Sequence, residues 1–237
     1  RFKDDYFKFM NYGYYNEELD ISLQKNDEIE RYPIQLYHHL CIQTELKDKI
    51  IVEVGSGRGG GANFIARYHS PKLITGVDLS PNAISLCKNN YNLNNLNFII
   101  GDSANLPFDN NSVDVVVNVE SSHCYPSIPD FISEVCRVLK PGGHFLYCDF
   151  VIGSALDDHL NKLKNNSLKD FQHVDITENI IKASELMTDD RNKIINKVNS
   201  SFLRKVLKSF ASVKGSKIYK SFVDRHYRYV SLVAEKK

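Results

Sequence analysis

The feature that most constrains this fold is an apolar run, residues 50–54, that carries an acid next to its end and passes at once into glycines. A strand inside a parallel sheet has both faces covered, so its sequence is almost continuously aliphatic. Glycines just past the carboxyl end of such a strand let the backbone approach a bound ligand closely. The segment therefore predicts a strand, a turn and a helix that together hold a cofactor.

The glycine spacing fits two classes of ligand. Residues 55–60 match Gly-x-Gly-x-x-Gly, the dinucleotide-binding fingerprint. Residues 53–59 equally match Glu-x-Gly-x-Gly-x-Gly, the turn that binds S-adenosylmethionine. The glycines alone do not decide between the two.

A second strand ends on an acid. Asp78 closes the apolar run of residues 73–78, and Ser80 with Pro81 then supplies an N-cap and a first-turn proline for the next helix. A carboxylate at this strand tip accepts hydrogen bonds from ribose hydroxyls. NAD and S-adenosylmethionine share that ribose, so Asp78 indicates an adenosine ligand without identifying it.

A third strand end favours S-adenosylmethionine. The run of residues 97–100 is followed by Gly101, Asp102 and a short Leu-Pro-Phe loop at residues 106–108. Asp102 is then placed to accept a hydrogen bond from the adenine amino group. This arrangement is not part of the dehydrogenase fingerprint.

The alternation of strands and helices continues to about residue 150. Residues 113–120 are typical of a fourth buried strand, and the helix through Val135 and Leu139 should stop at the Lys-Pro-Gly-Gly of residues 140–143. Strands that alternate with helices predict an α/β fold with a doubly wound sheet.

These motifs resemble the class I S-adenosylmethionine-dependent methyltransferases. The resemblance rests on residues 53–59, 76–78, 101–108 and 139–143, covers roughly residues 30–237, and makes residues 229–234 similar to that family's final strand. It implies a Rossmann-like sheet of seven strands with an antiparallel C-terminal strand and a helical lid. It also implies S-adenosylmethionine as the cofactor. The residues expected to bind it are Glu53, Gly55, Ser56, Gly57, Asp78, Leu79, Asp102, Ser103 and Glu120.

The flanking segments carry a closer resemblance. Residues 9–15, 30–37 and 118–126 are similar to small-molecule O-methyltransferases of the phthiotriol dimycocerosate type and to the sugar O-methyltransferases of natural products. This implies methyl transfer to a hydroxyl of a lipid, polyketide or glycoside.

His123 and Asp149 are the expected catalytic pair. His123 follows the fourth strand at the mouth of the crevice, and a histidine can remove a hydroxyl proton near neutral pH. Asp149 lies at the tip of the strand that begins at residue 145, where it could orient the imidazole or bind the acceptor. The similar sugar O-methyltransferases use such a pair, although they have a second histidine where this chain has Cys124. Alternatively, His123 is bonded to loop backbone and does no proton chemistry.

Aromatic residues are the expected contacts of the acceptor. Tyr12, Tyr14 and Tyr15 could close over the sulfonium, because aromatic faces attract cations, or they could form an ordinary packing surface. We expect Tyr14, Tyr15 and Tyr125 to contact the acceptor. No metal is expected, because the chain lacks the carboxylate and amide cluster of metal-dependent catechol methyltransferases.

Four segments are expected from the pattern. Residues 1–45 should form a helical and aromatic cover, 46–153 the S-adenosylmethionine-binding core, 154–190 a lid inserted after the fifth strand, and 191–237 the C-terminal helix and final strands. Loops at the carboxyl ends of strands build the crevice in such sheets, so an insertion there is well placed as a cover. Alternatively, residues 161–175 are a solvated connection.

Composition limits the partners. A net charge of +1 in 237 residues gives no reason to expect nucleic acid or an anionic membrane, and no apolar run is long enough to cross a bilayer. The five cysteines are odd in number and never spaced as Cys-x-x-Cys, which favours reduced thiols. The charged residues at the start do not resemble a signal peptide. We therefore expect a cytoplasmic monomer or homodimer acting on a small-molecule acceptor.

Two other functions stay open. The same fold could methylate nitrogen or carbon, as in sterol or quinone pathways. A nicotinamide-dependent reductase or a non-catalytic binder is the alternative from another class. Asp102 and the C-terminal pattern disfavour the reductase, and the presence of His123 with Asp149 disfavours the binder.

Overall fold

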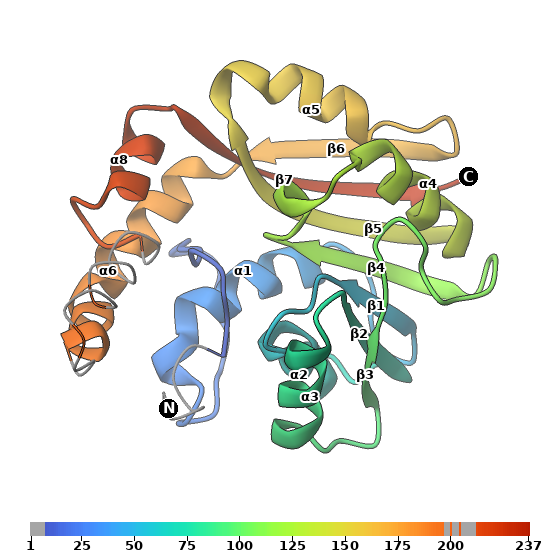
Figure 1. Ribbon diagram of the computed structural model, residues 1–237, viewed down its shortest axis with the longest axis horizontal. Coiled ribbons are helices and arrows are strands. Elements are labelled where there is room, and N and C mark those ends of the chain that lie inside the picture. Colours follow the sequence, from blue (N-terminus) through green and yellow to red (C-terminus); the bar gives the residue numbers. More distant parts are fainter. Residues whose placement is uncertain (1–7, 197–199, 201–203, 205–211) are drawn as a thin grey trace.

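The chain folds around one seven-stranded sheet with strand order β3-β2-β1-β4-β5-β7-β6 (Figure 1). The computed structural model describes residues 8–196, 200, 204 and 212–237. Strands β1 to β5 are parallel, and β7 runs antiparallel to its neighbours β5 and β6. The strands are β1 (Ile50–Val54), β2 (Leu73–Asp78), β3 (Leu96–Ile100), β4 (Val113–Val119), β5 (Leu139–Ile152), β6 (Leu168–Asp175) and β7 (Tyr227–Lys236).

Helices cover both faces of the sheet, which confirms the doubly wound prediction. One apolar core joins the sheet to α1, α2, α3, α6 and α8, and a second core joins the other face to α4 and α5. The described helices are η1 (Glu28–Glu30), α1 (Arg31–Cys41), α2 (Gly60–Tyr68), α3 (Pro81–Asn90), η2 (Ser122–Cys124), α4 (Ile128–Val138), η3 (Gly153–Ala155), α5 (Leu156–Leu163), α6 (Thr177–Asn196) and α8 (Lys217–Val223).

The central strand β1 forms as its sequence predicts. Its aliphatic residues are buried on both faces, and the chain turns sharply after Val54. Gly55 and Gly57 have φ of +76° and +53°, the left-handed region that favours glycine. A Cβ at Gly55 would also overlap the Ser121 hydroxyl. The turn therefore needs glycine both for its backbone and for the close approach of the loop after β4.

The strand order reverses next to β1, and this creates the crevice. From β1 the chain moves outward through β2 to β3, and then returns to the other side of β1 as β4. The loops at the carboxyl ends of β1 and β4 consequently diverge, and ligands of open α/β sheets bind at such a point. The Asn118 amide ties the two loops together by donating to the Val54 carbonyl at 3.0 Å.

The structure has the predicted helix ends, with a shift of one residue at the end of α4. Ser80 caps α3 by accepting a hydrogen bond from Ala83 N at 3.3 Å. Helix α4 ends at Val138, one residue before the predicted Leu139, and β5 begins there.

Strand β5 is longer than predicted. It runs to Ile152, so Asp149 lies inside the strand and pairs with Val230 of β7 instead of standing at a strand tip.

The segment of residues 154–190 differs from the expected lid. It contains α5, the edge strand β6 and the beginning of α6, and β6 pairs with β7. Residues 168–175 can join the sheet here because β7 would otherwise expose an unpaired edge. Of the expected C-terminal helix, residues 197–199, 201–203 and 205–211 lie outside the described residues, as do residues 1–7 of the expected cover.

Candidate active site

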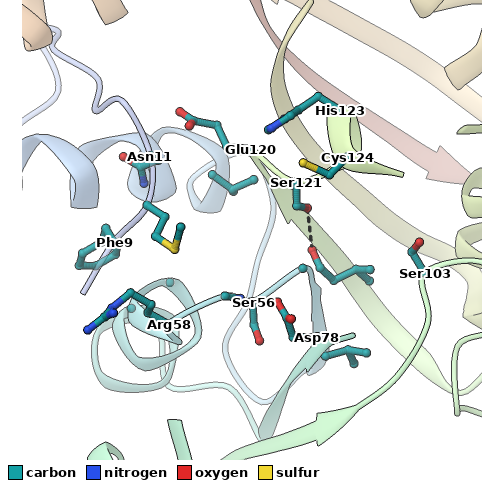
Figure 2. A pocket seen from close by; sticks show the side chains of 18 of the residues that line it. Phe9, Asn11, Ser56, Arg58, Asp78, Ser103, Glu120, Ser121, His123 and Cys124 are labelled. Carbon is teal, nitrogen blue, oxygen red and sulfur yellow. Dashed lines mark hydrogen bonds between the residues drawn. The ribbon is translucent and has the colours of Figure 1, made fainter. Parts of the chain in front are cut away.

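A cavity of about 840 Å³ opens at the carboxyl ends of β1, β2, β3 and β4 (Figure 2). The glycine turn, the loop after β4 and the N-terminal segment of residues 8–12 face one another across it. Most of the residues predicted to bind the cofactor line it. These are Gly55, Ser56, Gly57, Asp78, Leu79, Asp102, Ser103 and Glu120.

Asp78 is held rigidly at the end of β2. Its Oδ2 accepts a hydrogen bond from Gly57 N at 2.8 Å, and its Oδ1 accepts one from Ser80 N at 2.9 Å. A carboxylate has about four lone-pair positions, so these two bonds leave capacity for a ligand. The glycine turn and Asp78 are thus fixed relative to each other at the cavity wall.

Glu53 does not line the cavity, contrary to its predicted role as a cofactor contact. It is 1% exposed and lies behind the glycine turn, where its Oε1 accepts the Tyr37 hydroxyl at 2.6 Å. Burial raises the pKa of Glu53 to about 7, although the bond from Tyr37 lowers it. A Cβ at Gly61 would overlap this carboxylate. Glu53 is directed backwards because side chains alternate along β1, and its neighbours on the strand face the other helix layer.

His123 and Asp149 form a direct pair. The imidazole Nδ1 lies 2.8 Å from Asp149 Oδ1, and the His123 backbone N–H donates to Oδ2 at 3.0 Å. Asp149 is fully buried and also accepts from Ser122 Oγ and from Phe150 N. The imidazole ring packs against Phe150 with centroids 4.5 Å apart. The prediction that the two residues come together is met, although Asp149 reaches His123 from within a strand.

The electrostatics of His123 favour its protonated form. Burial lowers the pKa of the imidazole, but the hydrogen bond that its Nδ1–H donates to Asp149 and the negative charges of Asp149 and Glu120 outweigh it and raise the pKa above its usual value. An ionised carboxylate only accepts hydrogen bonds, so Nδ1 carries a proton. The neutral ring then has its lone pair on Nε2, and His123 lines the cavity (Figure 2).

Glu120 stands on a strained backbone beside this pair. Its φ is +46°, which a residue with a side chain adopts rarely. Its Oε1 accepts from Tyr12 N and from the Tyr229 hydroxyl, both at 2.7 Å. Burial and the charge of Asp149 raise the pKa of Glu120 to about 8.

Tyr14 and Tyr15 do not line the cavity, and their contact with the acceptor stays a prediction. Gly13 has φ of +82° and turns the chain away after Tyr12. Tyr14 is 4% exposed and stacks on His39, whereas Tyr15 packs against Tyr32. The direction of a side chain beyond such a turn cannot be predicted from the spacing of residues along the sequence.

Tyr125 and Tyr12 do line the cavity. The Tyr125 hydroxyl lies within 3.0 Å of both Asn118 Nδ2 and Ser121 Oγ. Tyr12 takes the place that was expected for its neighbours.

The N-terminal segment was expected as a cover without named cofactor contacts, and Arg191 is a part of the site that no motif indicated. Phe9, Met10 and Asn11 line the cavity, and Met10 is 71% exposed, which is unusual for a long apolar side chain. Arg191 of α6 donates to the Asn11 carbonyl at 3.2 Å. None of the residues 154–190, all of which are described, lines the cavity. The resemblance of residues 9–15 to other methyltransferases was the available signal for this segment, whereas Arg191 sits in a polar helix that gives none.

The described part of the chain contains neither a metal-binding cluster nor a membrane-spanning helix. Among residues 8–196, 200, 204 and 212–237, no group of three or more His, Cys, Asp or Glu side chains could hold a metal ion. No helix within the same residues has the length and apolar character needed to cross a membrane.

The sequence matches a family of known enzymes. Residues 52–147 match the model of the methyltransferase domain. A fatty-acid O-methyltransferase of Mycolicibacterium smegmatis is 36% identical over 90% of this chain and 78% of its own length. A phthiotriol/phenolphthiotriol dimycocerosates methyltransferase of Mycobacterium leprae is also 36% identical, over 90% of this chain and 80% of its own length.

Solved structures share the fold at lower identity. A putative sarcosine dimethylglycine methyltransferase from Galdieria sulphuraria superposes with a TM-score of 0.78 at 16% identity, over 97% of this chain and 94% of that one. The [4+2]-cyclase SpnF superposes with a TM-score of 0.69 at 19% identity, over 94% and 86%. A cyclase among the neighbours illustrates that the fold by itself does not specify the reaction.

Proposed function

Because the chain belongs to the S-adenosylmethionine-dependent methyltransferases, we propose that it transfers a methyl group to a hydroxyl of a lipid-like small molecule. Membership of this family decides against a nicotinamide-dependent reductase. We infer the acceptor and the residues that act on it from the cavity.

The described residues suit S-adenosylmethionine as the cofactor. The left-handed Gly55 and Gly57 leave room over the turn, and the carboxylates of Asp78 and Asp102 stand at the ends of neighbouring strands in the same cavity. In the proposed arrangement Asp78 accepts the ribose hydroxyls and Asp102 the adenine amino group. When bound, S-adenosylmethionine supplies a methyl group that its positive sulfur has already activated.

The observation that carries the hydroxyl assignment is the 2.8 Å contact between His123 Nδ1 and Asp149 Oδ1. A hydroxyl oxygen must lose its proton as it gains a methyl group. Asp149 holds the Nδ1–H tautomer and so leaves Nε2 free to accept that proton. It also stabilises the imidazolium that results, as a buried carboxylate does for other histidine bases. An acceptor that has no proton to lose does not need such a base.

A lipid-like acceptor is supported by the cavity wall and by the relatives. Phe9, Met10, Val119 and Phe150 present apolar surface to the same cavity that His123 and Glu120 line. Two relatives bear the names fatty-acid O-methyltransferase and phthiotriol/phenolphthiotriol dimycocerosates methyltransferase. An apolar wall favours an acceptor with an apolar body, because burying it releases water from both surfaces.

A fatty-acid carboxylate is the second candidate acceptor. It is favoured by the raised pKa of His123, because a protonated imidazole in an apolar cavity would attract a carboxylate. The two candidates require opposite protonation states. A hydroxyl acceptor requires neutral His123, whereas a carboxylate acceptor is best held by the protonated form.

The pH dependence of turnover distinguishes them. We expect the rate with long-chain alcohols and diols to rise with pH through the titration of His123, and this limb should be absent in His123→Ala. Loss of the base should lower turnover by about 10²–10⁴-fold. His173→Ala is the matched control, because this histidine lies on the exposed face of β6.

Three other results have clear meanings. A rate that falls with rising pH, seen with fatty acids and not with alcohols, would favour the carboxylate. Near-native turnover of His123→Ala with a hydroxylated acceptor would contradict the proposal. Turnover with amines alone would favour nitrogen methylation, because a neutral amine needs no base.

A further inference from the structure

We propose that Ser122, Tyr147 and His159 form a positioning network that holds the His123–Asp149 pair in its working orientation from behind the cavity wall. The inference rests on the proposed function, since it assigns the network to the base of that reaction. None of the three residues lines the cavity, so they would act through Asp149.

The network is a continuous series of short contacts. His159 Nε2 lies 2.7 Å from the Tyr147 hydroxyl, and that hydroxyl lies 2.8 Å from Ser122 Oγ. Ser122 Oγ donates to Asp149 Oδ2 at 2.7 Å, while Asp149 Oδ1 lies 2.8 Å from His123 Nδ1. The series connects α5, β5 and η2, three elements that are separate in the chain.

Counting protons gives the network one direction. Ser122 has a single hydroxyl proton, and Asp149 receives it. The Tyr147 hydroxyl must therefore donate to Ser122, and His159 Nε2 must carry the proton that it donates to Tyr147. If His159 accepted instead, the contact between Tyr147 and Ser122 would have no proton, and a buried polar atom would lose its partner at a cost of about 1–3 kcal/mol.

This direction fixes the state of the base. Every donor in the network points toward Asp149, so the carboxylate accepts throughout and His123 Nδ1 must donate to it. The lone pair of neutral His123 is then on Nε2 and available to an acceptor hydroxyl. The network thus selects one of the two tautomers of the imidazole and prevents Asp149 from turning away.

The surroundings keep the polar network intact. Tyr147, Asp149 and Ser122 are essentially inaccessible to water. On its own face of the sheet Tyr147 joins the apolar core with Phe145 and Leu160. Buried polar groups in such a core are costly unless each is bonded, and here each hydroxyl is.

His159 behaves as a constant donor. Burial lowers its pKa, Asp149 and Asp158 oppose this, and Lys162 adds to it. Both the neutral Nε2–H tautomer and the protonated ring donate to Tyr147. At the other end, Asp149 and Glu120 are the charged groups that act on His123. The direction of the network therefore does not depend on the charge of His159.

Removing a donor should strengthen the hold of Asp149 on His123. Each O–H that points at the carboxylate stabilises its negative charge, and without it the imidazolium is favoured more. We expect Ser122→Ala to raise the pKa of His123 by about half a pH unit or more. A shift of this size corresponds to only part of the free energy of one hydrogen bond to a charged group. Tyr147→Phe and His159→Leu should give smaller shifts in the same direction, whereas His159→Gln retains an N–H donor and should restore the native value.

The test combines two readouts. Imidazole NMR titration of His123, with S-adenosylhomocysteine bound, measures its pKa without turnover, and the ascending limb of the pH–rate profile should move by the same amount. A merely structural role would lower the rate at every pH. His173→Leu, on the exposed face of β6, is the control.

Failure of this inference can be told apart from failure of the proposed function. If His123→Ala abolishes turnover while Ser122→Ala and Tyr147→Phe leave both the His123 titration and the limb unchanged, the network is overturned. If the titration shifts as expected but His123→Ala retains turnover, the network stands and the assignment of the base is wrong. A His159→Gln variant that shifts as much as His159→Leu would contradict the donor role of His159.

Discussion

At the scale of single residues, two buried carboxylates show how environment sets chemistry. Asp149 accepts hydrogen bonds from several N–H and O–H donors beside His123. Glu53 is equally buried but receives the Tyr37 hydroxyl on one oxygen, and its Oε2 has no partner among the described residues. Burial without enough donors favours the neutral form of a carboxyl group.

This difference predicts a pH dependence of stability. The pKa of folded Glu53, about 7, lies above its usual value of 4.5, so the folded state holds this proton more tightly than the unfolded state. The resulting stability is complete below pH 4.5 and is lost as the pH rises through 7. It amounts to about 3 kcal/mol at most.

Urea denaturation between pH 4.5 and 8 measures this loss. Glu53→Gln keeps an acceptor for Tyr37 and cannot ionise, so its free energy of unfolding should fall less over this range. Glu134→Gln is the control, because Arg137 lowers the pKa of Glu134 and that group gives the opposite slope in a more acidic range. Equal curves for the native chain and Glu53→Gln would show that Glu53 is ionised when folded.

At the scale of elements, the cover of the cavity is a short N-terminal segment. Residues 8–12 cross the glycine turn, and the Tyr12 N–H is bonded to Glu120 on the opposite wall. The segment of residues 154–190 gives the sheet its edge strand β6, and its role as a lid stays a prediction. A segment with few backbone bonds of its own opens more easily than a strand paired along its length.

We therefore expect the N-terminal segment to respond to ligand. Amide hydrogen exchange of residues 9–12 should slow when S-adenosylhomocysteine is added, because a filled cavity holds the segment in place. Residues 168–175 serve as an internal control, and their exchange rate should not change when S-adenosylhomocysteine is added. Slowing confined to the second segment would return the role of cover to residues 154–190.

At the scale of the whole molecule, the site depends on the reversal of strand order at β1. The reversal separates the loops after β1 and β4, and the resulting cavity is lined from β1, β2, β3, β4, β5 and α6. Binding in such a cavity joins parts of the sheet that are far apart in sequence. Ligand affinity is therefore coupled to global unfolding. The predicted choice between monomer and homodimer stays a prediction.

This coupling predicts selective stabilisation by the product cofactor. S-adenosylhomocysteine should raise the free energy of unfolding by about 2.7 kcal/mol at a hundredfold excess over its Kd, and NADH should not. Asp78→Ala should weaken binding by about 1.5–3 kcal/mol through its lost hydrogen bonds. Calorimetry on Asp78→Ala and on the control Asp109→Ala measures this. Stabilisation by NADH alone would contradict the assignment of the cavity.

The sequence by itself determined the elements whose signals are local. An aliphatic run with both faces buried, a left-handed glycine turn and acids at strand ends place β1, Asp78 and Asp102 correctly, because each signal lies within a few residues of the feature it encodes. Because His123 directly follows the fourth strand, the sequence also predicted that it lies at the cavity. The strand pattern also placed Asp149 near His123, and the resemblance to a known family added its expected role as the catalytic partner.

Only the tertiary structure decided which distant side chains meet. Tyr14 is turned into the core by Gly13, Arg191 reaches the cavity from a polar helix, and His159 contacts Tyr147 across elements. Strand β6 likewise joins the sheet because β7 offers it an edge. Side-chain direction depends on strand register and helix rotation, and a change of one residue in either sends a side chain to another face. Such contacts are fixed by the packing of the whole chain, so no short stretch of sequence encodes them.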